Sequence, residues 1–163
     1  MAALRVLGQG EQAAERAMTE VFWPARMQRL RRGPLAEAAP QAELWLDGGH
    51  NASAGEALAR HLAGLAARPT WLICGMLNTK DVRGYLRPMS GQVEGLYAVS
   101  IPEEVNTLPA SATAAAARDV GMAAEEADSV DAALAGIVAR DPTARILLGG
   151  SLYLAGQILR ENG

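Results

Sequence analysis

The 163-residue sequence predicts an α/β fold in which a mostly parallel, Rossmann-like sheet is covered by helices on both faces. Short runs of consecutive apolar residues, typical of strands that are buried on both faces, recur along the chain. Segments with apolar residues at helical spacing alternate with these runs. Hydrophobic residues make up 50% and aromatic residues only 4%, which predicts a closely packed core of small side chains. The length indicates one domain, or one domain with a fragment of another.

The strands are expected where apolar residues run without interruption between turn-forming residues. Five segments meet this description: residues 43–46, 71–74, 96–99, 122–124 and 145–148. The 122–124 segment is the weakest of them because it is short and rich in alanine. Residues 26–32, which Gly33-Pro34 bounds, are expected to form an irregular extended segment.

The helices are expected where apolar residues recur every three or four positions. Six segments qualify: residues 11–21, 53–65, 82–89, 112–120, 130–138 and 151–159. Pro24 ends the first, because the residue before a proline avoids the α region. Ser53 and Glu56 match a capping box for the second. The last helix is expected to bury Leu152, Ala155 and Leu159 on one face.

Charge and cysteine content exclude several classes of function. The chain carries 15 Lys and Arg against 18 Asp and Glu, so its net charge of −3 disfavours non-specific binding to nucleic acids or membrane surfaces. It has no apolar run of about 18 residues that would span a membrane, and its first residues do not resemble a signal peptide. The single Cys74 lies in an apolar run and is expected to be a buried core residue. Cytoplasmic localisation fits this pattern best.

Polar and small residues follow three of the expected strands. The stretches are residues 47–51 (DGGHN), 75–81 (GMLNTKD) and 149–151 (GGS). Ligands of open α/β sheets bind beyond the carboxyl ends of strands, where helix N-termini also point. Asp47 could accept hydrogen bonds from ribose hydroxyls, the glycines after it would let the backbone approach a ligand, and Ser151 could meet an anion.

Structural roles remain open for the same residues. Asp47, Asn51, Ser53 and Asp81 could each cap a helix, and His50 could be an ordinary loop histidine. A second histidine, His61, falls in the middle of a helix and is expected to be structural.

The arginine cluster has two interpretations as well. Its members are Arg26, Arg29, Arg31 and Arg32. Such a cluster is most often a solvated face, and the functional alternative is that one arginine reaches a phosphate while the others stay in solvent.

Residues 8–13 (GQGEQA) fit the dinucleotide pattern G-x-G-x-x-A. That pattern also requires an acidic residue at the end of a second strand about 20 residues later. The sequence at that distance, residues 23–30 (WPARMQRL), is basic. An NAD-binding domain built on Gly8 and Gly10 is therefore a minor alternative.

Four motifs occur in order: W-P-A-R-M-Q at 23–28, D-G-G-H-N at 47–51, K-D at 80–81 and G-S-L-Y at 150–153. Together they resemble the C-terminal domain of the bifunctional dihydrofolate synthase/folylpolyglutamate synthase family, a branch of the Mur ligase superfamily. The resemblance makes residues 23–163 the Mur ligase C-terminal domain and residues 1–22 the tail of a preceding ATPase domain. Ala25, Gly49 and Ala52 replace the glycine, alanine and proline that the family usually carries.

The resemblance implies an ATP-dependent ligase that joins L-glutamate to dihydropteroate or a folate through an acyl phosphate. It implies that ATP lies between two domains, with Arg26 near the phosphates and Asp47 at the ribose. It places His50 and Ser151 near the cleft, in the handling of glutamate. The phosphate loop and the Mg²⁺ ligands would belong to the N-terminal domain, so the chain alone is expected to be inactive. A free-standing nucleotide-binding module without catalysis is the alternative.

Overall fold

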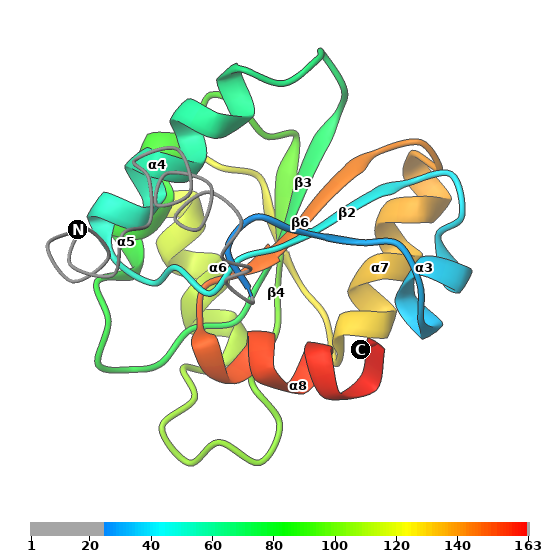
Figure 1. The fold of residues 1–163 in the computed structure, drawn as a ribbon. Helices are drawn as coiled ribbons and strands as arrows, with labels where there is room; N and C mark the ends of the chain where they lie inside the picture. Colours follow the sequence, from blue (N-terminus) through cyan, green and yellow to red (C-terminus); the bar gives the residue numbers. More distant parts are fainter. Residues whose placement is uncertain (1–24, 163) are drawn as a thin grey trace, which may run out of the picture.

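The computed structural model describes residues 25–162, which form one sheet flanked by helices (Figure 1). The strands are β1 (Gln28–Leu30), β2 (Glu43–Leu46), β3 (Thr70–Cys74), β4 (Gly95–Ala98), β5 (Ala124–Glu126) and β6 (Arg145–Gly149). The helices are α3 (Pro34–Ala38), α4 (Ala52–Ala63), α5 (Val82–Leu86), α6 (Ala110–Asp119), α7 (Val130–Arg140) and α8 (Leu152–Asn162), with a 3₁₀ turn η1 (Arg87–Met89) after α5. The predicted helix 11–21, the 8–13 motif and the predicted tail 1–22 lie outside the described residues.

The strand order is β1-β2-β6-β3-β4-β5. Strands β2 to β6 pair in parallel, and only β1 at the edge is antiparallel to its neighbour β2. The last strand, β6, therefore inserts between β2 and β3. This order confirms the predicted α/β class. It also creates a topological switch point, where the loops that follow adjacent strands lead in opposite directions and leave a crevice for a ligand.

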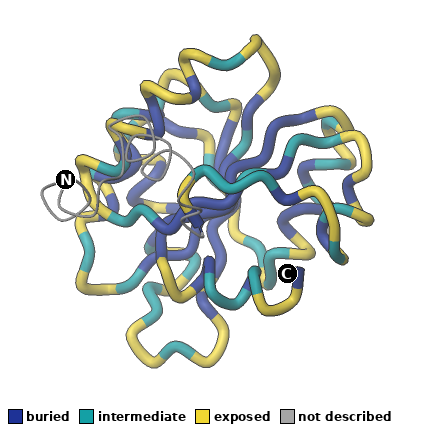
Figure 2. The backbone as a smooth tube through the Cα atoms, in the orientation of Figure 1, coloured by how far each residue is buried: buried dark blue, intermediate teal, exposed yellow. Residues whose placement is uncertain are grey.

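Helices cover both faces of the sheet. One face packs against α4, α5 and α6, and its core includes Leu58, Tyr85 and Ala117. The other face packs against α3, α7 and α8, and its core includes Leu35, Leu134 and Ile158. Buried residues follow the strands through the middle of the molecule, whereas exposed ones lie on the outer helix faces and loops (Figure 2). No helix in the described range 25–162 is long and apolar enough to cross a membrane.

The structure corrects several details of the sequence analysis. The segment predicted as irregular contains strand β1, whose short polar sequence hides an edge strand. Helix α3 starts directly at Pro34, which suits the first helical position. The 122–124 strand lies two residues later, as β5.

Two further corrections concern helix ends and faces. Helix α4 begins at Ala52 with Asn51 as its cap: Oδ1 of Asn51 accepts from the Ala54 amide at 2.9 Å, so the Ser53–Glu56 capping box is wrong. In α8, Ala155 is buried as predicted, but Leu152 is 59% exposed, and Leu154 and Ile158 fill the core instead. Helix α7 is capped by Ser129, whose Oγ accepts from the Ala132 amide at 3.1 Å.

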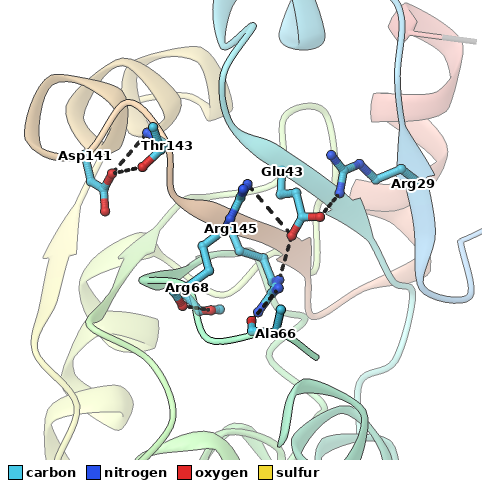
Figure 3. Close-up of polar contacts among 8 residues, drawn as sticks. Arg29, Glu43, Ala66, Arg68, Asp141, Thr143 and Arg145 are labelled. Carbon is cyan, nitrogen blue, oxygen red and sulfur yellow. Dashed lines mark hydrogen bonds and ion pairs between the residues drawn. The ribbon is translucent and has the colours of Figure 1, made fainter. Parts of the chain in front are cut away.

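An ion-pair network ties together the amino ends of β2 and β6 (Figure 3). Glu43 Oε1 lies 2.6 Å from Arg29 of β1, and Glu43 Oε2 accepts from Nε of Arg145 at 2.9 Å. A second nitrogen of Arg145 donates to the Ala66 carbonyl at 3.0 Å. Burial raises the pKa of Glu43, but the hydrogen bonds from the two arginines outweigh it and hold the pKa below its usual value. Arg29, expected in a solvated cluster, is thus a structural residue of the edge strand.

Candidate active site at the carboxyl ends of the central strands

The three predicted ligand-binding stretches lie next to one another. They follow β2, β3 and β6, and these strands are adjacent because β6 lies between the other two. A pocket of about 580 Å³, here called the main pocket, is lined by Arg26, Asp47 and His50 among others. A smaller cavity of about 190 Å³ is lined by His50, Lys80 and Ser151 together with Leu77, Gly150, Leu152 and Tyr153. His50 and Leu152 border both spaces.

Asp47 organises the loop that forms the main pocket. The residue is only 6% exposed; its Oδ2 accepts from the Met27 amide at 2.9 Å and its Oδ1 from the Gly49 amide at 2.7 Å. The Gly48 amide donates to the Ala25 carbonyl at 2.7 Å. The aspartate therefore ties the turn before β1 to the turn after β2. Each carboxylate oxygen can accept a second hydrogen bond, which leaves lone pairs for a ligand hydroxyl at the pocket wall.

The turn that Asp47 holds has unusual backbone geometry. Ala25 and Met27 have φ values of 56° and 42°, in the left-handed region that favours glycine. The glycine that the resembling family carries at position 25 fits this conformation without strain. Between these two residues, the exposed side chain of Arg26 borders the main pocket. Arg31 and Arg32 are also exposed but do not line it.

His50 is half-buried and oriented by its own loop. Its Nδ1 lies 3.1 Å from the Gly48 carbonyl oxygen. Because a carbonyl only accepts, this contact requires a hydrogen on Nδ1. In the neutral ring, Nε2 then remains as an acceptor for a ligand, which suits a group that handles an ammonium or takes up a proton.

Ser151 opens helix α8 at the floor of the small cavity. It is 2% exposed, its Oγ accepts from the Tyr153 amide at 3.1 Å, and its carbonyl accepts from the Ala155 amide. The hydroxyl hydrogen is left to donate to a ligand. The preceding Gly150 has φ +98°, and a Cβ there would lie 2.8 Å from Cys74 Sγ. A glycine is needed at that position to bring Ser151 over the strand end.

The glycines after Asp47 also serve internal packing. A Cβ on Gly48 would lie 2.4 Å from the Leu152 side chain, and one on Gly49 would lie 2.7 Å from Cβ of Ala54. Their lack of a side chain thus lets the turn approach α4 and α8. The sequence analysis expected the same glycines to let the backbone approach a ligand.

The K-D motif acquires a structural explanation. Asp81 is the cap of α5, and its Oδ1 accepts from the Gly84 amide at 2.9 Å. Lys80 is half-buried and lines the small cavity. Among the described residues, it takes part in none of the ion pairs.

Sequence reasoning missed two residues of this region. His61, expected to be structural, is exposed on α4 and lines the main pocket, with its ring edge-on to Trp45 at 6.0 Å. Tyr85, expected only as a core residue of a helix, has its hydroxyl at the strand ends. A buried tyrosine needs a polar partner for its hydroxyl, and this requirement could have identified Tyr85 as a residue near the site.

The remaining acidic and thiol groups give no metal centre within residues 25–162, where no cluster of three or more His, Cys, Asp or Glu side chains could hold an ion. Cys74 is the predicted core residue: burial raises the pKa of its thiol to about 12, so it stays protonated.

The chain is similar to known proteins of one kind. Residues 35–161 match the family model described as dihydrofolate synthetase, C-terminal domain. No curated protein matches the chain. Among solved structures, the Mycobacterium tuberculosis folylpolyglutamate synthase complexed with ADP and AMPPCP aligns with a TM-score of 0.78 and 24% identity, covering 98% of this chain and 37% of that one.

Two further structures agree. E. coli FolC in complex with DHPP and ADP aligns with a TM-score of 0.74 and 23% identity, covering 98% of this chain and 36% of that one. A bifunctional folylpolyglutamate synthase/dihydrofolate synthase with Mn, AMPPNP and L-glutamate bound aligns with a TM-score of 0.72 and 23% identity, covering 97% and 37%. The chain thus spans little more than a third of these proteins, and the likeness establishes the fold. The match over residues 35–161 shows that the chain belongs to the dihydrofolate synthetase C-terminal domain family.

Proposed function

We propose that this chain is the C-terminal lobe of an ATP-dependent ligase that joins L-glutamate to dihydropteroate or a folate through an acyl phosphate. The observation that carries the proposal is the family match, which spans three of the four motifs. Its support is the convergence of residues from all four motifs on two adjoining spaces at one edge of the sheet. Residues 23–163 would be the Mur ligase C-terminal domain and residues 1–22 the tail of the ATPase domain.

The residues at this edge suit the charges of the reaction. The reaction brings together a polyphosphate, an acyl phosphate and the carboxylates of glutamate, so cationic groups and hydrogen-bond donors must dominate the site. Arg26, exposed at the main pocket, would contact the ATP phosphates, and the free lone pairs of Asp47 would accept from the ribose. His50 and Ser151, which share the small cavity, would bind and orient glutamate. Solved relatives carry ADP, AMPPNP or L-glutamate.

The remaining parts of the reaction would come from the rest of the ligase. The N-terminal ATPase domain of the same polypeptide would supply the phosphate loop, the Mg²⁺ ligands and most of the pterin site. When held there, Mg²⁺ would supply charge stabilisation at the phosphates. The chain alone would therefore be inactive, and the ligase would work in the cytoplasm, where ATP is available.

The test is ATP hydrolysis and amide formation by the whole ligase, measured with and without glutamate. Arg26→Ala should lower kcat/KM for ATP by about 10- to 100-fold, because a hydrogen bond to a charged group contributes about 1.5–3 kcal/mol. Arg32→Ala is the matched control, because it removes the same charge from the same segment outside both spaces. Asp47→Ala is a poorer test, since it also frees the two turns that the carboxylate joins. The proposal would be contradicted by equal rates of ATP hydrolysis with and without glutamate, or by an Arg26→Ala enzyme with unchanged kcat/KM for ATP.

Calorimetry separates the ligase lobe from a free-standing nucleotide-binding module. If half of the nucleotide site lies on another domain, the isolated chain should bind ATP weakly or undetectably. Clear saturation by the chain alone would favour the module, and preferential binding of NAD would favour the dinucleotide motif at residues 8–13.

A further inference from the structure

Tyr85 lies where the turns after β2 and β6 approach each other. The side chain comes from α5 and is 2% exposed. The point beside Gly149 where another residue would carry Cβ is 3.1 Å from the Tyr85 hydroxyl oxygen. The equivalent point beside Gly49 is 3.8 Å from Cε2 of the same ring. One ring thus contacts the turn that carries His50 and the strand end that leads to Ser151.

The hydroxyl is neutral and engaged with backbone. Burial, with smaller contributions from Cys74 and the Asp47 carboxylate, raises the pKa of Tyr85 well above its usual value, while a hydrogen bond from the Gly150 amide opposes the rise. The phenol oxygen lies against the backbone of Gly149, two residues before Ser151.

Two neighbouring contacts fix the backbone that carries the ring. Asp81 caps α5, so the helix begins at a defined residue. On the other side, a Cβ on Gly55 of α4 would lie only 2.1 Å from the Tyr85 carbonyl oxygen, which shows how closely the two helices approach. The backbone of Tyr85 therefore cannot shift without moving α4 or α5.

We propose that Tyr85 is a positioning residue, which sets the separation of the two turns so that His50 and Ser151 face the same small cavity. The inference rests on the proposed ligase function, because it assigns Tyr85 to the reaction that this cavity would serve. Errors of about 1 Å in the placement of reacting groups can cost two orders of magnitude in rate. In a cavity of about 190 Å³, a displacement of either turn changes the geometry directly.

Tyr85→Phe in the whole ligase tests the proposal, since it keeps the ring and removes only the hydroxyl. We expect kcat at saturating ATP and glutamate to fall by about 10-fold or more, while KM for ATP changes by less than about 2-fold. Tyr97→Phe is the matched control: Tyr97 is also a buried tyrosine, but it contacts Trp71 and Gly136 on the opposite face of the sheet. A tyrosine that serves only stability would lower Tm and leave kcat of the folded enzyme unchanged, which would overturn the proposal.

Nuclear magnetic resonance on the unaltered chain gives a second measurement that needs neither activity nor a variant. Ring protons of Tyr85 should show nuclear Overhauser effects to the amides of Gly49 and Gly150, and the Gly150 amide should exchange slowly with solvent. In Tyr85→Phe, amide shifts should reach Ser151 and His50. Shifts confined to α5, or absent contacts in the unaltered chain, would overturn the role of Tyr85. A whole ligase without glutamate-dependent hydrolysis would instead refute the proposed function, whatever these spectra show.

Discussion

Gly55→Ala should destabilise the protein, although it improves helix propensity. Gly55 is in α4, where alanine is favoured over glycine by about 1 kcal/mol in a helix interior. In the tertiary structure, the added Cβ would lie 2.1 Å from the Tyr85 carbonyl oxygen and 3.0 Å from its carbonyl carbon. Backbone cannot rotate away as a flexible side chain can, so the two helices must separate.

The magnitude follows from the size of this overlap. A real Cβ does not approach a heavy atom within 3.0 Å, so α4 and α5 must move apart by roughly 1 Å at this point. Overpacking of this kind costs typically 1–3 kcal/mol, and a backbone-to-backbone contact belongs at or above the upper end of that range. After the gain in propensity is subtracted, we expect a net loss of about 2 kcal/mol. Tm should fall by about 4–8 °C for a chain of this size.

Urea unfolding of the chain, followed by circular dichroism, measures the difference. Gly156→Ala is the matched control: this glycine is also inside a helix, α8, but its Cβ would meet only an Arg160 side-chain nitrogen at 3.8 Å. The control should be unchanged or up to about 1 kcal/mol more stable. If Gly55→Ala is as stable as Gly156→Ala, the close approach of α4 and α5 is refuted.

Four further variants test three other parts of the structure. Asn51→Ala should cost about 1 kcal/mol of unfolding free energy through loss of the α4 cap, and Ser53→Ala almost nothing; equal costs by urea unfolding would restore the capping box. Glu43→Gln should cost about 2 kcal/mol at pH 7 by removing the partner of two arginines. Because folding lowers the pKa of Glu43, this contribution is present above the ordinary glutamate pKa of 4.5 and is lost as pH falls through the folded pKa. The two stability curves should therefore converge in acid, and parallel curves from pH 7 to 3 would contradict this. Lys80→Gln in the whole ligase should raise KM for glutamate by about 10-fold, because the cavity it lines would lose a cation that attracts carboxylates; an unchanged KM would exclude that role.

Features of this fold that depend on local interactions could be predicted from the sequence, whereas those that depend on distant contacts could not. Buried parallel strands need apolar side chains on both faces, so β3 and β6 could be predicted from continuous runs of apolar residues. Strand β1 was not, because an edge strand with polar residues pairs on one side only. The cap of α4 was misassigned because Asn51 and Ser53 are both good caps and the sequence does not distinguish their backbone conformations.

The candidate site divides in the same way. The motifs identified the candidate residues, and their positions after predicted strands placed them at the carboxyl ends of the sheet. That His50 and Ser151 border one small cavity depends on β6 lying between β2 and β3. These two pairings join residues 102 and 75 positions apart, as in Glu43–Arg145 and Thr70–Arg145. The structural role of Asp47, which joins the turn before β1 to the turn after β2, also depends on a distant contact: its Oδ2 accepts a hydrogen bond from the Met27 amide.

The sequence by itself determined the α/β class, the positions of the central strands and the residues of the family motifs, because local hydrophobic patterning and residue chemistry encode them. Only the tertiary structure decided the strand order, the exposure of Leu152 and the place of Tyr85 beneath the two turns. Helical spacing identifies an apolar face but not what covers it. The contact of Tyr85 with Gly49 and Gly149 exists because segments far apart in the chain pack together, and a local sequence pattern does not predict such a long-range contact.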